Sequence, residues 1–136
     1  MGAANECIPY YEPGTRITGH ASAAVVGKRV ADISADSQSG PGLSATAEGG
    51  NIVVATAAAR AKGIGVFSHD AARDEKVTVL CSPMVVPITA EAGITAGEEV
   101  QVGAAGGVVK YSDGAKIGRA LATAADRDDT MVKLYD

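Results

Sequence analysis

One segment of this 136-residue chain occurs twice. The first copy covers residues 62–80 and the second covers residues 116–135. Each joins an isoleucine and a glycine, through a charged connection, to a stretch in which apolar and polar residues alternate. We align the copies with about two extra residues in the second connection. Alternation with a period of two is the pattern of a half-buried strand, and its repetition predicts a small antiparallel β fold.

Similar short patterns cover most of the remaining chain. Two short strands are expected between residues 23 and 33, joined at Gly27-Lys28. The alanine-rich residues 56–62 fit either a helical turn or a crossing loop, and Asp113-Gly114 predicts a hairpin turn. The other expected strands lie near residues 52–55, 63–67, 76–81, 84–89, 99–103, 107–111, 116–122 and 131–135.

The composition favours a thin β core. The chain has 17 glycines and many alanines, no tryptophan, and Phe67 as its only phenylalanine. Apolar burial contributes only about 25 cal/mol per Å², so small side chains add little, and we expect assembly with copies or partners to add stability. Pro83 and Pro87 flank a short apolar run and indicate an edge strand or a closed corner, because proline cannot donate to a strand ladder. The expected fold class is therefore all-β, a small antiparallel barrel or sandwich.

Charge and cysteine content narrow the choice of partners. The net charge is −4, and no basic stripe is present that could neutralise a run of phosphates, so we expect no nucleic-acid binding. No apolar run reaches the roughly 18 residues of a membrane span, so no membrane partner is expected. Cys7 and Cys81 lie far apart in the sequence and are expected to be free thiols.

The residues that carry chemistry in other proteins do not form a recognisable site here. Residues 68–70 read Ser-His-Asp, but consecutive residues on an extended chain cannot converge as a catalytic triad. Two histidines and two cysteines give no zinc pattern, and Asp126, Asp128 and Asp129 lack the glycine and distal glutamate of a calcium loop. The spacing of Gly63 lacks the third glycine of a dinucleotide site. We expect no enzyme activity, cofactor, metal or small-molecule substrate.

The N-terminal residues differ in character from the rest. Residues 1–16 are expected to form an extended arm ahead of a β domain over residues 17–136, in which one long loop covers about 35–50. Proline fixes φ and favours extended geometry in the preceding residue. The arm would pack along its own sheet, or reach a neighbouring subunit or a larger surface. The candidate docking residues are Ile8, Pro9, Tyr10, Tyr11, Glu12 and Pro13.

Taken in order, these patterns resemble the small head decoration proteins of tailed bacteriophages. The resemblance covers nearly the whole chain except the loop at 35–50, and it depends on the order of the motifs, since each alone is common in β proteins. The matching segments are 6–14, 18–21, 24–30, 49–52, 62–66, 75–79, 94–100, Gly118-x-Ala120 and Val132-x-Leu134-Tyr135.

The resemblance implies a non-enzymatic virion protein on the outer surface of the capsid. Such a protein binds the major capsid protein and stabilises the head, commonly as a homotrimer at threefold and quasi-threefold positions. Two other functions remain open. One is a carrier-like or carbohydrate-binding β module, because residues 94–100 resemble a carrier hairpin, although residues 82–86 lack the lysine that a carrier needs. The other is a low-copy head or fibre component.

Overall fold

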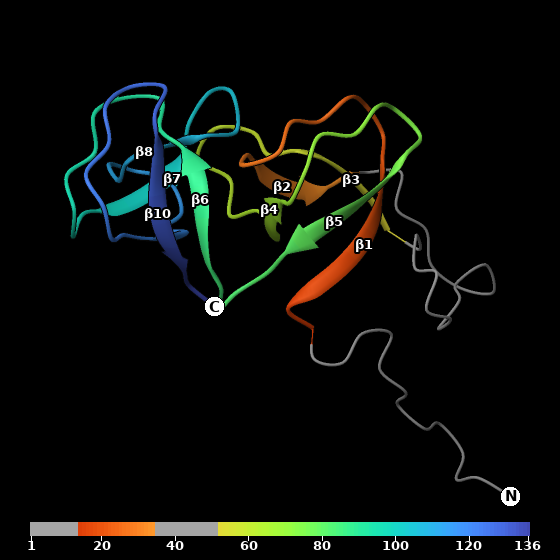
Figure 1. Ribbon diagram of the computed structural model, residues 1–136, viewed down its shortest axis with the longest axis horizontal. Helices are drawn as coiled ribbons and strands as arrows, with labels where there is room; N and C mark the ends of the chain where they lie inside the picture. Colours follow the sequence, from red (N-terminus) through yellow and green to blue (C-terminus); the bar gives the residue numbers. More distant parts are fainter. Residues whose placement is uncertain (1–13, 35–51) are drawn as a thin grey trace, which may run out of the picture.

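The computed structural model describes residues 14–34 and 52–136, and within these ranges every regular element is a β-strand (Figure 1). The same ranges contain no helix that is long and apolar enough to cross a membrane. The strands are β1 (Arg16–Ala21), β2 (Val30–Ile33), β3 (Ile52–Thr56), β4 (Gly65–Phe67), β5 (Lys76–Leu80), β6 (Val85–Thr89), β7 (Glu99–Val102), β8 (Val108–Lys110), β9 (Gly118–Ala120) and β10 (Asp129–Leu134).

The ten strands form two five-stranded units, which lie side by side in Figure 1. The first unit, β1 to β5, is a closed barrel with the strand order β1-β3-β2-β4-β5. The second unit, β6 to β10, is a sheet with the order β6-β10-β9-β7-β8. If β6 is matched to β1 and each later strand to its counterpart, both orders describe the same ring. The chain is therefore an internal duplication, and the all-β barrel prediction is confirmed.

The duplication extends to individual residues. An isolated bridge joins Val25 to Ala71 in the first unit, and the corresponding bridge joins Ile94 to Ala124 in the second. The connections between the last two strands also have equal length, since β4 and β5 begin at residues 65 and 76 and β9 and β10 begin at residues 118 and 129. The expected two-residue insertion in the second copy is therefore wrong. It came from aligning like charges in a loop where charge is not constrained by packing.

The second unit is not closed by its own strands, and the first unit completes it. In the first unit β1 and β3 pair in parallel over three residues, whereas the corresponding pairing in the second is a single bridge between Ala90 and Val108. A short segment of the first unit lies in the gap. The N–H of Thr89 donates to the carbonyl oxygen of Lys28 (3.1 Å), and the N–H of Val30 donates to that of Gly106 (2.7 Å). Backbone hydrogen bonds thus join the two units.

The core is divided between two clusters that do not follow the unit boundary. One lies inside the first barrel around Phe67, which is 1% exposed. The other fills the second unit and also contains Val30 and Val66 of the first, with Leu80 packed against it. These three side chains are neighbours in register on β2, β4 and β5. The first unit thus buries an apolar stripe of its outer surface against the second.

Two acceptors hold the loops of the second unit. The buried Gln101 side chain accepts, through Oε1, the backbone N–H groups of Ser112, Asp113 and Gly114 at 2.9–3.1 Å. The Glu91 carboxylate accepts the N–H groups of Ala105 and Gly107 in the same way. In each case one side chain accepts several backbone N–H groups of the same loop. It therefore fixes a loop that has no strand pairing of its own to satisfy those groups.

The structure corrects several strand predictions. Strand β1 was not expected as a strand, and residues 23–33 contribute one named strand, β2, that begins after Gly27-Lys28. Asp113-Gly114 is not a hairpin turn, because β7 lies between β8 and β9 and the loop crosses it. Of residues 56–62, Thr56 ends β3 and the others form a crossing loop toward β4. Pro87 lies in β6, which pairs with β10 at the end of the second sheet, as an edge strand should.

Candidate functional site

The docking residues predicted from the sequence lie outside the described part of the chain. This applies to the whole set: Ile8, Pro9, Tyr10, Tyr11, Glu12 and Pro13. The loop at 35–50 and Cys7 lie outside it as well. Cys81 is half-buried against the first core cluster, and burial raises the pKa of its thiol.

The outer face of the second sheet carries an uncovered row of apolar side chains. Met131 on β10 lies opposite Pro87 on β6, and on its other side the N–H of Leu121 donates to the Met131 carbonyl oxygen (2.7 Å). Met131 is 49% exposed and Leu121 is 46% exposed. We call Pro87, Leu121 and Met131 the apolar row. Val85, also 49% exposed, extends it along β6, and a shallow hollow of about 330 Å³ lies over Val85, Pro87 and Met131.

The first unit carries polar residues, exposed or half-buried, at the same positions. The counterparts of Met131 and Pro87 are Thr78 and Thr18, which lie opposite each other in the β1–β5 pairing. The counterpart of Leu121 is Ser68, whose N–H donates to the Thr78 carbonyl oxygen (3.0 Å). All three carry hydroxyl groups. The fold therefore does not require apolar residues at these positions, and the row is specific to the second unit.

In the neighbouring row of outward positions, the first unit carries the apolar residues and the second unit carries the charged ones. In the first unit it holds Val30, Val66 and Leu80, the stripe that the second unit covers. In the second unit the corresponding residues are Glu99, Arg119 and Lys133, which lie opposite one another in register. In this row the covered positions are thus apolar and those that face water are polar, as burial energetics favours. The apolar row departs from this pattern, because several exposed apolar side chains lie together there and nothing in the described chain covers them. Val26 and Ile33, in the first unit, are also exposed.

The charges around the apolar row leave it with a positive border. The Glu99 carboxylate is bound by Lys116 (3.2 Å) and by the Tyr135 hydroxyl (3.1 Å). At the opposite end, a hydrogen bond from Lys28 (2.7 Å) lowers the pKa of Asp129, to which Thr89 also donates.

Neither Arg119 nor Lys133 forms an ion pair with a carboxylate of residues 14–34 or 52–136. Both side chains are exposed on the strands that carry the row. The border therefore holds two positive charges on a chain whose net charge is negative.

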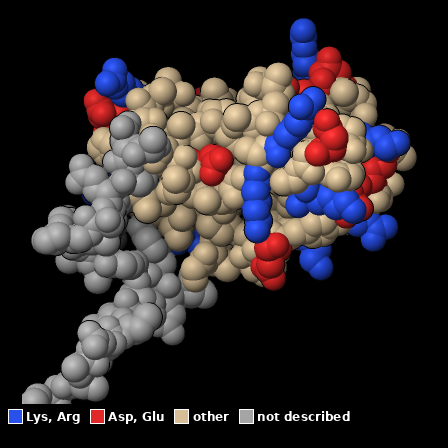
Figure 2. Space-filling view, turned by 180° about the vertical axis from the view of Figure 1, so that it is seen from behind, with Lys and Arg blue, Asp and Glu red and all other residues tan. Residues whose placement is uncertain are grey.

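The opposite side of the molecule is different. Figure 2 shows Lys and Arg side chains interspersed with Asp and Glu over the end that the second unit forms, and a broad uncharged area across the middle. Elsewhere in the second unit, Lys110 and Glu98 form an ion pair (3.1 Å), and a backbone hydrogen bond from Thr95 together with Lys110 lowers the pKa of Glu98. Mixed charge of this kind is typical of a solvated surface and not of a phosphate-binding one.

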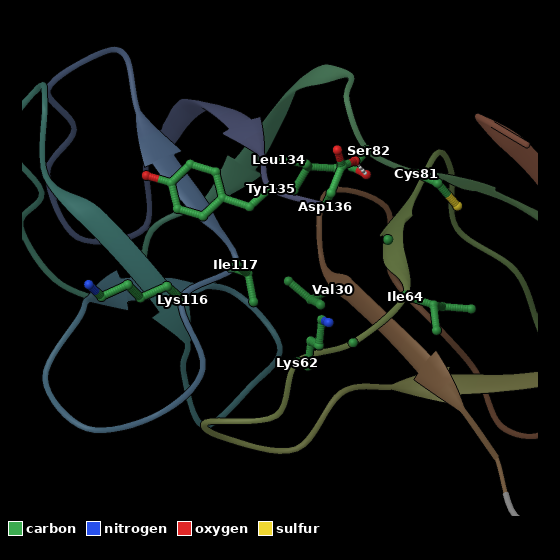
Figure 3. A pocket seen from close by; sticks show the side chains of 12 residues that line it. Val30, Lys62, Ile64, Cys81, Ser82, Lys116, Ile117, Leu134, Tyr135 and Asp136 are labelled. Atoms are coloured by element: carbon green, nitrogen blue, oxygen red, sulfur yellow. Dashed lines mark hydrogen bonds between the residues drawn. The ribbon is translucent and has the colours of Figure 1, made fainter.

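A cleft lies where the two units meet (Figure 3). Its apolar floor includes Val30 and Ile117, Lys62 and Lys116 stand at its rim, and its volume is about 150 Å³. Pockets for small molecules typically measure about 300–1,000 Å³. We interpret the cleft as a groove left by the packing of two rounded units.

The triad-like residues do not converge. The His69 Nδ1 atom lies 2.8 Å from the carbonyl oxygen of Asp70, and the Asp70 carboxylate accepts the Gly27 N–H (2.8 Å). Ser68, His69 and Asp70 are all exposed. In the described ranges, no cluster of histidine, cysteine and acidic side chains has the makings of a metal site.

Comparison with known proteins decides the family. The model of the phage cement protein family matches residues 12–134. The chain belongs to this family. Membership makes it a structural protein of the phage head, in agreement with the resemblance described above. No curated protein matches the chain.

A solved structure confirms the fold. The head fibre gp8.5 N base of bacteriophage phi29 superimposes with a TM-score of 0.69, covering 88% of this chain and 92% of that one. The two sequences are 19% identical, so the similarity concerns architecture.

Proposed function

We propose that this cement protein binds the outer surface of an assembled phage capsid and stabilises the head. Its partner would be the major capsid protein, and its assembly a homotrimer at threefold and quasi-threefold positions. Family membership over residues 12–134 is the observation that carries this proposal. The hydrogen-bonded double unit and its uncovered apolar row suit a protein that works by contact.

The mechanism is additive. A subunit that bridges two capsomers raises the free energy needed to separate them by the energy of its weaker contact. Many copies on one shell make the sum large even when each contact is weak. The N-terminal arm, residues 1–16, would add to the contact area of the β region over 17–136. We propose Ile8, Pro9, Tyr10, Tyr11, Glu12 and Pro13 as its docking residues.

Sedimentation tests the proposal directly. Purified protein is mixed with heads that lack it, bound particles are separated on a density gradient, and copies per particle are counted by quantitative mass spectrometry. We expect saturable binding at hundreds of copies per head, roughly the regime where multivalent contacts add up. We also expect a higher temperature of head disruption. A folded protein that stays at the top of the gradient would refute capsid binding.

The structural match favours one alternative, a low-copy head or fibre component. The phi29 protein with this architecture is a head fibre base. Copy number separates the two functions, because a decoration protein should approach the abundance of the major capsid protein and a fibre base should not.

A further inference from the structure

Comparison of the two units indicates what the apolar row contacts. We propose that the row, with Val85 and its border of Arg119 and Lys133, is the face that docks on the major capsid protein. The inference rests on the proposed function and adds the surface and the chemistry of its partner. That partner offers an apolar surface flanked by carboxylates.

The internal duplication provides the first argument. Each outward position occurs twice in one chain, once in each unit, so the two copies act as matched controls. Val30 and Val66 are apolar and covered, whereas Ser68, the counterpart of Leu121, is polar and exposed. Leu121 and Met131 are apolar and 46% and 49% exposed, and a cover from outside the described residues would bury them.

The second argument concerns the mode of contact. Pro87 has no N–H, and the Thr89 N–H on the same edge of β6 already donates to Lys28. An incoming strand would therefore find little to pair with along this edge. The contact must use the side-chain face of the sheet.

The third argument selects the capsid over a second copy. A stable contact between two free proteins uses about 20–30 residues on each side, far more than the row and its border supply. Two such faces would also bring the Arg119 and Lys133 charges of both copies together, which opposes self-association. A trimer on a shell would engage several such sites at once, so a small contact per subunit suffices there.

The fold itself supplies the test substitutions. Leu121→Ser and Met131→Thr install the residues that the first unit has at these positions. Pro87 is left in place to keep the edge of β6 closed. Val26→Thr is the matched control, since Val26 is 53% exposed and its counterpart in the second unit is Thr95. Exposed substitutions of this kind change stability by only about 0.5 kcal/mol, and thermal melting verifies that.

The experiment measures head occupancy against protein concentration for the three proteins, and light scattering gives the mass of each in solution. We expect the double variant to bind heads at least about tenfold more weakly, a change of roughly 1.4 kcal/mol, with solution mass and the Val26→Thr control unchanged. Lys133→Glu should also weaken binding, and Lys62→Glu, on the cleft rim, should not.

Three results would overturn the inference. Unchanged head binding by the double variant would show that the row is not the docking face. A drop in solution mass would assign the row to contacts between copies. Failure of the unaltered protein to bind heads would remove the proposed function and this inference with it, and is recognised because it does not depend on the substitutions.

Discussion

Val66 tests whether the two units share one core. Its side chain is 1% exposed and packs in the cluster of the second unit although it belongs to β4 of the first. Val66→Ala removes both methyl groups at about 0.8 kcal/mol each, and the cavity left behind raises the cost to about 2–3 kcal/mol. With an unfolding entropy of about 2.1 cal/mol/K per residue, the melting temperature should fall by roughly 7–10 °C.

Circular dichroism gives the melting temperature, and hydrogen exchange read by mass spectrometry locates the loss. We expect amide protection to fall in both units, because the cluster joins them. Arg119→Ala is the control, since Arg119 is the counterpart of Val66 and is exposed, so its change should stay within about 0.5 kcal/mol. The reasoning fails if the two substitutions have equal effects, or if protection falls in the first unit alone.

Three further predictions concern local devices. Gly106→Ala should destabilise the fold by more than about 1 kcal/mol, because Gly106 has φ +85° and a Cβ there would lie 2.3 Å from Thr56 Cγ2. Adding Thr56→Ser should restore part of the loss in melting temperature. No restoration would contradict the clash. Gln101→Leu should speed exchange of the three loop N–H groups that its Oε1 accepts, and cost about 2 kcal/mol; unchanged exchange would show that water replaces it. The pKa of Asp129 lies below its ordinary value of 3.8. Its pairing with Lys28 therefore stabilises the fold above that pH, and this stabilisation is lost as pH falls through the folded pKa. Asp129→Asn should make the melting temperature depend less on pH in the acid range, and an unchanged dependence would rule out the pair as its source.

The strands with strong side-chain contrast were predictable. In β5, Val77 and Val79 alternate with polar residues and are buried. In β10 every second side chain is buried, Val132 among them. Strand β1 escaped prediction because two of its inward residues are Gly19 and Ala21, which erase the alternation. Only a hydrogen fits at Gly19, where a Cβ would lie 2.8 Å from a methyl group of Val54. Packing, and not hydrophobic contrast, specifies that strand.

Pairing and the docking face depend on information that a local pattern lacks. Asp113-Gly114 does mark a loop, but β7 occupies the place of the expected partner strand. The apolar row could be found only by comparing the two copies of the repeat position by position. Met131 is then seen to replace Thr78, and Leu121 to replace Ser68. The equal spacing of the copies, which the sequence alignment missed, is what makes that comparison valid.

The segment from Lys28 to Val30 has a consequence for how the protein is made. The first unit completes its own ring of strand pairs, whereas the second needs this segment between β6 and β8. Ribosomes deliver the N-terminal part first, and domains tend to fold as they emerge. The closed ring is thus ready when β6 appears, and the open side of the second unit is filled as it forms. A circular permutant that delivers β6–β10 first would expose that side during translation, when unpaired strands aggregate most readily.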